Sequence, residues 1–171
     1  MRLLLALRSV LFVLLLPGTV AGYVPFWIIS ATHHFNPIDL SVSSVVAATL
    51  ILAGVVALGR CVWDFFASGH GTLAPIDPPR YLVVQGLYRF TRNPMYNGVL
   101  AILFGEAWIF ESSALLKYAL LVFILFHLFV RFHEEPSLES RFGESYRRYR
   151  KAVPRWGITV RPFRDNSGHA A

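Results

Sequence analysis

The sequence predicts an all-α integral membrane protein with about four transmembrane helices and a cytoplasmic amphipathic carboxyl-terminal helix. Apolar residues make up 55% of the 171 residues and charged residues only 15%, whereas charged residues form about 25% of an ordinary soluble domain. The charge deficit falls in four long apolar runs. Helices satisfy their own backbone hydrogen bonds, so such runs can cross a bilayer. We expect a single domain over residues 1–171.

The first two apolar runs are long enough to cross a bilayer as helices. They extend from Ser9 to about Ser30 and from Leu40 to Gly59, and a span needs about 20 residues. An alternative for the first run is a secretory signal peptide, with residues 19–21 as a small-residue cleavage site. Apolar sequence continues beyond this site through Ile29, which favours an uncleaved helix.

The last two apolar runs predict a tight helical hairpin. They extend from about Tyr96 to Phe110 and from Ala114 to Phe132, and only residues 111–113 separate them. The first of the two is short for a span, so the pair would cross a thinned bilayer or lie tilted in it. Glu106 lies in this shorter run, where it faces either the bundle or the outer interface.

The positions of lysine and arginine predict the orientation. If the amino terminus is cytoplasmic, fifteen of the sixteen basic residues fall on the inner side, and Lys117 alone falls outside. The predicted outer loop from Ala31 to Asp39 contains no lysine or arginine. Cytoplasmic loops of membrane proteins carry this excess of positive charge. We therefore expect a multi-pass protein with both termini in the cytoplasm, in the inner membrane if the cell is bacterial.

Several other classes of site are disfavoured. The net charge of +6 would suit nucleic acid on a soluble basic face, but here the basic residues flank or follow apolar runs, so the expected partners are membrane lipids and not nucleic acid. The single cysteine, Cys61, excludes a disulfide framework and a cysteine-rich metal site. His33 and His34 have no partner at ligand spacing, and we expect no metal. The oligomeric state stays open.

Two polar segments lie on the predicted inner side. The first is a loop rich in glycine and proline that ends on Arg92-Asn93-Pro94, where asparagine suits the N-cap and proline the first helical turn. In the second, His127, Arg131 and Glu134 share one helical face within about 40°, and Glu135 borders it. Ionisable groups at membrane depth are functional candidates. The simpler interpretation, an interface anchor, is favoured for Arg131 but not for the adjacent acids.

A basic amphipathic helix is predicted from Pro136 to about Ala152. Its aromatic face includes Phe142, Tyr146 and Tyr149, and its other faces carry arginine and lysine. It would lie on anionic headgroups, close a pocket over the two acids, or do both.

The two polar segments resemble a known superfamily. Residues 86–98 contain Arg92-Asn93-Pro94-Met95-Tyr96, and residues 134–154 contain Glu-Glu-Pro and Phe-Gly-x-x-Tyr-x-x-Tyr. Together they resemble the isoprenylcysteine carboxyl methyltransferase and phospholipid methyltransferase superfamily over a core of about residues 69–160. The family commonly has histidine after the motif arginine, where this chain has Asn93.

The resemblance implies an S-adenosylmethionine-dependent methyltransferase that binds its donor without a Rossmann sheet. Carried onto this sequence, it implies catalytic roles for Arg92 and Glu134. It also implies cofactor contacts from Tyr88, Asn93, Pro94, Tyr96, Glu134, Glu135 and Tyr146. The donor's ammonium suits the two glutamates, its carboxylate suits Arg92, and its sulfonium suits the faces of Tyr96 or Tyr146.

The expected acceptor is lipophilic and is methylated at the cytoplasmic face of the membrane. A prenylated cysteine carboxylate, a phospholipid amine and another small lipophile all fit. One alternative is an NADPH-dependent sterol-type reductase, but such enzymes are expected to carry a Cys-rich variant in place of the Glu134-Glu135 motif. A non-catalytic membrane protein is a second alternative, which leaves the polar face unexplained.

Overall fold

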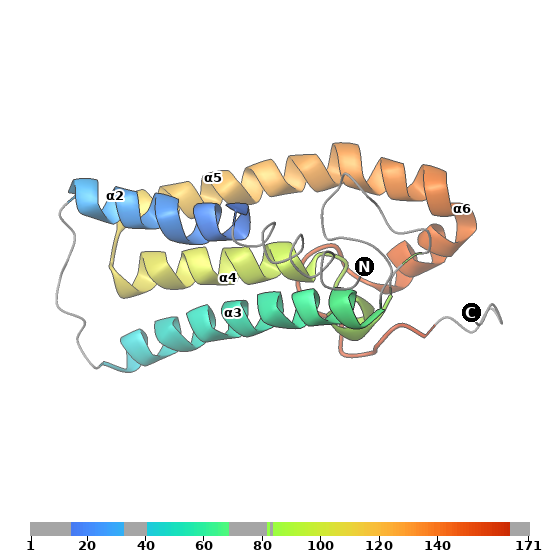
Figure 1. Ribbon diagram of the computed structural model, residues 1–171, viewed down its shortest axis with the longest axis horizontal. Coiled ribbons are helices and arrows are strands. Elements are labelled where there is room, and N and C mark those ends of the chain that lie inside the picture. The colour runs from blue at the N-terminus through green and yellow to red at the C-terminus, as the bar shows by residue number, and fades with distance from the viewer. Residues whose placement is uncertain (1–14, 33–40, 69–81, 83, 165–171) are drawn as a thin grey trace.

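The computed structural model describes residues 15–32, 41–68, 82 and 84–164, and helices are the regular structure in these ranges (Figure 1). The amino-terminal segment and most of both predicted loops lie outside them, so the expectations about a signal peptide, His33, His34 and residues 69–81 stay predictions. In chain order the elements are η1 (Thr19–Tyr23), α2 (Val24–Thr32), α3 (Val42–Ser68), η2 (Gly86–Arg89), α4 (Pro94–Ile109), α5 (Ser113–Phe129), η3 (Val130–Glu134) and α6 (Glu135–Ala152). For these described residues, the prediction of an all-helical protein is confirmed.

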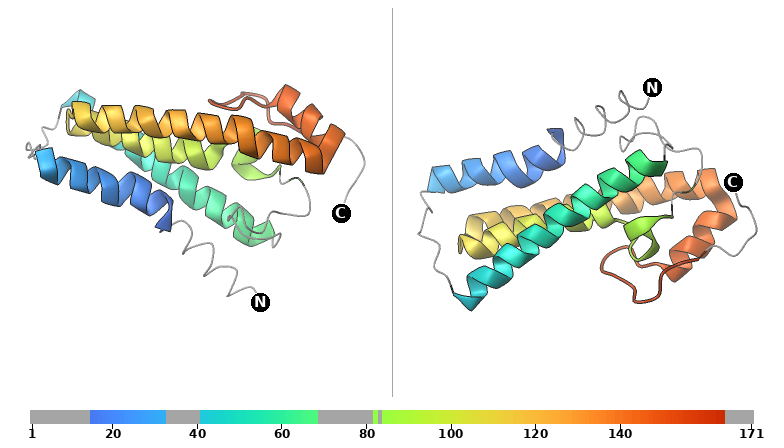
Figure 2. Two further views of the ribbon diagram at one scale, coloured as in Figure 1. Left: turned by 90° about the horizontal axis from the view of Figure 1, so that it is seen from above. Right: turned by 60° about the horizontal axis from the view of Figure 1, so that its bottom comes forward.

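Helices α2 to α5 lie side by side, and each runs opposite to the one before it (Figures 1 and 2). The end of α3, the start of α4 and the end of α5 therefore meet at one end of the bundle. Element η2, helix α6 and residues 153–164 gather there as well. We call this the polar end, and we call the opposite end, where α4 turns into α5, the hairpin end.

Helices α3 and α4 approach closely because glycines lie at their contact. A Cβ atom on Gly54 would lie 2.5 Å from the carbonyl oxygen of Gly98, and one on Gly105 would lie 3.0 Å from the carbonyl oxygen of Ala47. Larger side chains would push the helices apart, as small residues at helix contacts in membranes avoid doing. The start of α4 is thereby held against α3.

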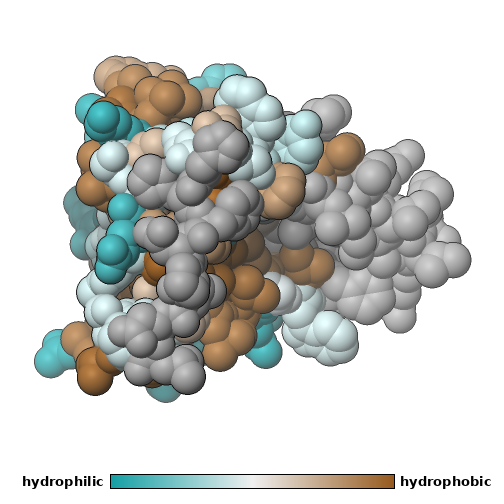
Figure 3. All heavy atoms as spheres, turned by 90° about the vertical axis from the view of Figure 1, so that its left-hand side faces the viewer, coloured by the Kyte–Doolittle hydropathy of each residue, from teal (hydrophilic) through white to brown (hydrophobic). Residues whose placement is uncertain are grey.

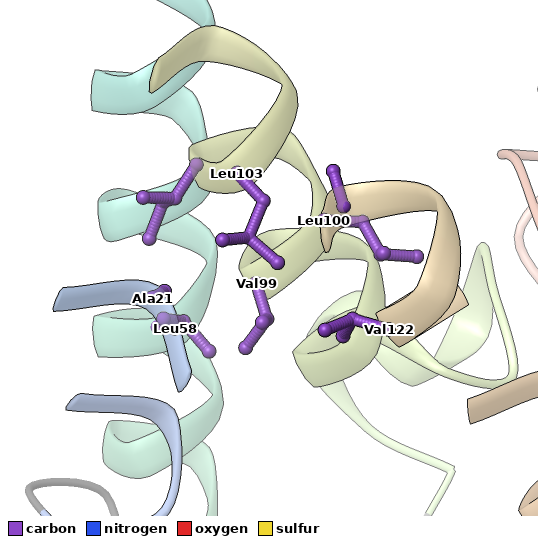
Figure 4. Packing of buried hydrophobic residues seen from close by; sticks show 8 residues of the cluster. Ala21, Leu58, Val99, Leu100, Leu103 and Val122 are labelled. Atoms are coloured by element: carbon purple, nitrogen blue, oxygen red, sulfur yellow. The ribbon is translucent and has the colours of Figure 1, made fainter. Parts of the chain in front are cut away.

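The main hydrophobic core joins α3, α4 and α5 with the turn that precedes α2. Leu58 of α3 packs with Val99, Leu100 and Leu103 of α4 and with Val122 of α5 (Figure 4). The π-helical turn η1 adds Ala21 to the same cluster. The core thus fixes the registers in which α4 and α5 reach the polar end.

The outer faces of the bundle are apolar. Large hydrophobic side chains are exposed along α3 and α5, among them Leu52, Val56, Ile124 and Leu128. By length and composition, Val42–Asp64 and Ser113–Ala152 could each cross a membrane, while the apolar helix Thr19–Thr32 is shorter and α4 has only 16 residues. These features indicate that the protein associates with a membrane. The number of spans and their orientation stay predictions.

The predicted hairpin between the last two apolar runs is present. Helix α4 ends at Ile109, and α5 begins at Ser113 after a turn in which Glu111 has a φ of 47°. The Ser112 hydroxyl caps α5 by accepting a hydrogen bond from the backbone N–H of Leu115 at 3.3 Å. The predicted end of the second run was wrong, because α3 continues beyond Gly59 to Ser68. Arg60 is part of that helix and pairs with Asp64 at 3.1 Å.

The predicted stripe of His127, Arg131 and Glu134 is broken. Residues 130–134 form a π-helical turn between α5 and α6, and a π turn adds a residue to the helical repeat and rotates the turns after it. His127 and Glu134 are partly buried, but Arg131 is exposed and its guanidinium lies 5.9 Å from the Phe132 ring centroid. This position agrees with an interface anchor for Arg131.

The predicted helix over residues 136–152 is present as α6, but it is bent at Gly143. Gly143 has φ 53° and ψ −122°, a conformation that glycine adopts without the steric cost of a side chain, and the chain turns back there (Figure 1). The aromatic residues still gather, because the two halves of α6 face each other. Leu138 and Phe142 from the first half pack against the cluster formed by Tyr146, Tyr149 and Val153.

Candidate active site

The segment that begins α4 is fixed by residues that come after α6. The backbone N–H of Arg92 donates to the Pro154 carbonyl at 3.0 Å. Asn93 occupies the N-cap position and Pro94 the first helical turn, as predicted, but the Asn93 side chain makes no capping hydrogen bond. Its side-chain Nδ2 donates instead to the Arg155 carbonyl at 3.1 Å. The carboxyl-terminal segment therefore positions Arg92 through its own backbone and through the neighbouring Asn93.

A buried ion cluster lies at the start of α6. Arg92 Nη1 is 2.7 Å from Glu135 Oε1. Arg155 donates two hydrogen bonds to the same carboxylate, from Nε to Oε1 at 2.6 Å and from Nη2 to Oε2 at 2.8 Å. The Glu135 side chain is only 4% exposed. Such a cluster is stable only while all its charges remain paired.

Glu134 has a different environment from its neighbour. Its Oε2 accepts a hydrogen bond from Tyr96 Oη at 3.2 Å, and it forms no ion pair with another residue that the structure describes. The Tyr96 ring packs against Phe126 of α5, with ring centroids 4.6 Å apart. The two adjacent acids thus differ in their partners: two arginines hold Glu135, whereas Glu134 is the carboxylate free to pair with a cation.

The tyrosines of α6 close the cluster from the other side. Tyr146 is buried, and its Oη lies 3.4 Å from Arg92 Nη1. Tyr149 Oη donates to the Tyr88 carbonyl at 2.6 Å, which ties η2 to α6. Burial raises the pKa of the Tyr88 phenol well above its ordinary value, so that side chain stays neutral.

These side chains surround a small cavity of about 20 Å³, room for about one water molecule. Its lining consists of Arg92, Asn93, Val130, Glu134, Glu135, Leu138, Tyr146 and Tyr149. The Nε of Arg92 is buried and has no hydrogen-bond partner among the described residues. An unpaired buried donor costs about 1–3 kcal/mol. An acidic ligand group would remove this cost.

A larger hollow lies at the hairpin end, and most of the side chains that line it are apolar. It measures about 620 Å³, and Leu50, Phe104, Trp108 and Leu116 are among its lining residues. Figure 3 views the bundle from that end, where hydrophobic residues lie among hydrophilic ones. The clustered arginines, carboxylates and tyrosines lie at the polar end, so we assign the candidate active site there.

Comparison with known proteins shows the family to which the chain belongs. The family model of phospholipid methyltransferases matches residues 38–145, well over half the chain. The protein belongs to the phospholipid methyltransferase family. The resemblance found in the sequence is therefore confirmed. Of the site residues, Arg92, Tyr96, Glu134 and Glu135 lie within the matched range, and Tyr146 lies just beyond it.

Individual relatives of this phospholipid methyltransferase family member cover only part of it. A phosphatidylethanolamine N-methyltransferase of Aspergillus terreus is 39% identical over 95 residues, which are 54% of this chain and 9% of that protein. The protein of the same name in Aspergillus flavus is 34% identical over 94 residues, 53% of this chain and 9% of its own length. An uncharacterized protein of Haemophilus influenzae is 42% identical over 63 residues, 36% of this chain and 98% of its own length. No solved structure matches.

The structure of this family member brings together most of the predicted site residues. Arg92, Asn93, Glu134, Glu135 and Tyr146 line one cavity. Tyr96 reaches it through its hydrogen bond to Glu134, Tyr88 contributes its backbone carbonyl to Tyr149, and Pro94 shapes the start of α4.

Sequence reasoning missed two residues of the carboxyl-terminal segment. Arg155 completes the ion cluster. Trp156 Nε1 donates to His127 Nδ1 at 3.0 Å, and the Trp156 ring packs against Phe123 at a centroid distance of 5.4 Å. The signal in the sequence was an arginine and a tryptophan directly after the motif, in a chain with two adjacent acids that need partners.

Proposed function

We propose that the protein is an S-adenosylmethionine-dependent methyltransferase that methylates a phospholipid amine at the cytoplasmic face of a membrane. The observation that carries the proposal is the buried cluster of Arg92, Glu134 and Glu135 at one end of an apolar helical bundle. Family membership supports methyl transfer, and the names of the Aspergillus relatives favour an amine over a carboxylate acceptor.

The residues of the site fit the charged groups of the donor. The unpaired Nε of Arg92 suits the donor's carboxylate. Glu134 suits the donor's ammonium, because it forms no ion pair within the described part of the chain. The faces of Tyr96 and Tyr146 suit the sulfonium. Because the cavity has room for about one water molecule, the lining side chains must move apart when a nucleoside-sized molecule binds.

The donor, when bound, supplies the methyl group. The contribution of this chain is then alignment: Arg92 and Glu134 hold the two charged ends of the donor's amino-acid portion. Holding two reactants in line can lower a barrier by about 7–11 kcal/mol at most. The buried tyrosines exclude water, which strengthens the electrostatic interactions inside the site.

The membrane supplies the acceptor. We propose four spans, α2 to α5 with their flanking apolar residues, so that both termini and the polar end face the cytoplasm. A phospholipid headgroup would then reach the site from the inner leaflet. The water-soluble donor would enter from the cytosol, beside α6 and the segment before Arg92.

The direct test uses purified protein in phosphatidylethanolamine vesicles with methyl-labelled S-adenosylmethionine. We expect label in mono-methylated and further methylated phospholipid, and little label with the Glu134→Ala variant. Vesicles of phosphatidylglycerol, which has no amine, are the matched control. Label in a different lipid of a host extract, with none in phosphatidylethanolamine, would overturn the acceptor. Binding of NADPH in place of S-adenosylmethionine would overturn the reaction class.

A further inference from the structure

Two guanidinium groups share one buried carboxylate at the polar end. Arg155 occupies both oxygens of Glu135, at 2.6 and 2.8 Å, while Arg92 makes one contact through Nη1 at 2.7 Å. Neither arginine duplicates the other. Arg155 forms the bidentate pair that favours arginine over lysine, and Arg92 keeps an unpaired Nε.

This arrangement explains why Arg92 forms only one hydrogen bond with Glu135. A buried carboxylate with a single arginine attracts that guanidinium into the two-bond geometry that binds most strongly. Arg155 already forms a two-bond pair with both oxygens of Glu135, so Arg92 is left with a single contact to Oε1. The Nε of Arg92 is then left without a hydrogen-bond partner among the described residues.

The position of Arg155 is fixed by the backbone around it. Asn93 donates to the Arg155 carbonyl, and the carbonyl of the preceding residue, Pro154, accepts from the Arg92 backbone. The next residue, Trp156, is bonded to His127 of α5. Arg155 and Arg92 are therefore linked through backbone as well as through Glu135. The hydrogen bond to Glu135 also raises the pKa of the Arg155 guanidinium above its ordinary value.

We propose that Arg155 is a positioning residue: it takes the two-bond pairing with Glu135, so that Arg92 keeps its Nε–H free to bind the carboxylate of the methyl donor. This inference rests on the proposed function, since it requires a donor with a carboxylate. Without Arg155, Glu135 would draw Arg92 into a two-bond pair, and the site would lose its preference for a ligand carboxylate.

The test compares two ligands rather than one. S-adenosylhomocysteine and its decarboxylated counterpart are titrated into detergent-solubilised protein by calorimetry. The wild type should prefer the carboxylate-bearing ligand by about tenfold or more, the range for a hydrogen bond between charged groups. In Arg155→Ala this preference should fall to about threefold or less, with the affinity for the decarboxylated ligand nearly unchanged.

A purely structural role would give a different result. If Arg155→Ala weakens both ligands by the same factor, or leaves the preference intact, the positioning role is wrong. Arg155→Lys retains the charge without the planar fork and should show an intermediate preference, which keeps the test valid if the alanine variant fails to fold. Arg161→Ala removes an exposed arginine of the same segment and should match the wild type.

The same titration separates the inference from the proposed function. Wild-type protein that binds neither ligand would overturn the proposed function, and the role of Arg155 with it. Wild-type protein that binds both ligands equally would leave the methyltransferase proposal standing but overturn the pairing of Arg92 with a carboxylate, and therefore the positioning role.

Discussion

Arg92 and Glu135 lie 43 residues apart in the chain and meet in an ion pair of 2.7 Å, with side chains only 10% and 4% exposed. The pair joins the residues just before α4 to the first residue of α6. Those are the two segments whose motifs resembled the methyltransferases. The close packing of α3 against α4 and the π turn after α5 bring them to the same end of the bundle.

Removal of Glu135 should destabilise the protein strongly. Glu135→Ala leaves two arginines without their buried counter-charge, and loss of one partner of a buried pair costs about 3–5 kcal/mol. The matched control is Glu139→Ala on the same helix, whose pairs with Arg147 and Arg150 are partly exposed and are worth about 1 kcal/mol or less. Denaturant unfolding in detergent measures both. Equal losses in the two variants would mean that the cluster does not stabilise the fold.

Loss of Glu134 should affect turnover more than stability. Glu134→Ala should abolish methyl transfer, because the donor's ammonium loses its counter-charge. Tyr96→Phe removes only the hydrogen bond to Glu134 and should lower turnover by about tenfold or less. Arg131→Ala, at an exposed position, should stay near wild-type turnover. Near-normal turnover in Glu134→Ala would contradict its role, and a severe loss in Arg131→Ala would contradict the anchor interpretation.

Sequence patterns predicted the helices and the paired polar motifs because both depend on local rules. Apolar runs locate helices, and Asn93-Pro94 marks where α4 begins. The bend at Gly143 and the π turn over residues 130–134 were missed, since periodicity assumes a straight α-helix. The glycine at position 143 was a sequence signal for such a bend, because glycine permits the positive φ found there.

The division of labour between the adjacent acids could not be predicted from the sequence. Glu134 and Glu135 look equivalent in the sequence. Only the structure shows that residues 153–156 return to the start of α6, where Arg155 pairs with Glu135. That contact depends on the path of a segment without regular structure, which no periodic pattern specifies. Contacts between residues this far apart in the chain can be identified only from the folded structure.

The contact between α3 and α4 should tolerate no added side chain. Gly54→Ala places a Cβ 2.5 Å from the Gly98 carbonyl oxygen, and overpacking of this kind costs about 1–3 kcal/mol. Gly59→Ala is the control on the same helix, since a Cβ there meets nothing within 4 Å and alanine favours a helix over glycine. The thermal unfolding temperature should fall for the first variant and hold or rise for the second. The reverse order would show that the two helices are not in close contact.

The proposed orientation can be tested with single cysteines. Cys61 is buried, so it should give little background with a membrane-impermeant thiol reagent. Glu111→Cys at the hairpin end and Glu144→Cys in α6 both replace exposed residues. In intact cells only the first should react, and in inside-out vesicles only the second. Labelling of both positions from the same side would overturn the proposed four-span topology.

The apolar chain of the acceptor should govern its apparent affinity. The proposal places the acceptor's route along lipid and the donor's route in the cytosol, with the exposed apolar side chains of α5, such as Ile124 and Leu128, facing the lipid. Partitioning into the bilayer gains about 0.8 kcal/mol per methylene. Each added methylene should therefore change the apparent affinity by about fourfold at most. A series of ethanolamine phospholipids with short acyl chains, assayed below their micelle concentrations with protein in inert vesicles, should therefore show KM falling steeply as the chains lengthen. The KM for S-adenosylmethionine should stay nearly constant across the series, since the donor does not enter through lipid. Equal efficiency for the shortest and longest acceptors would contradict entry from the bilayer and would indicate that the acceptor reaches Glu134 from the aqueous side.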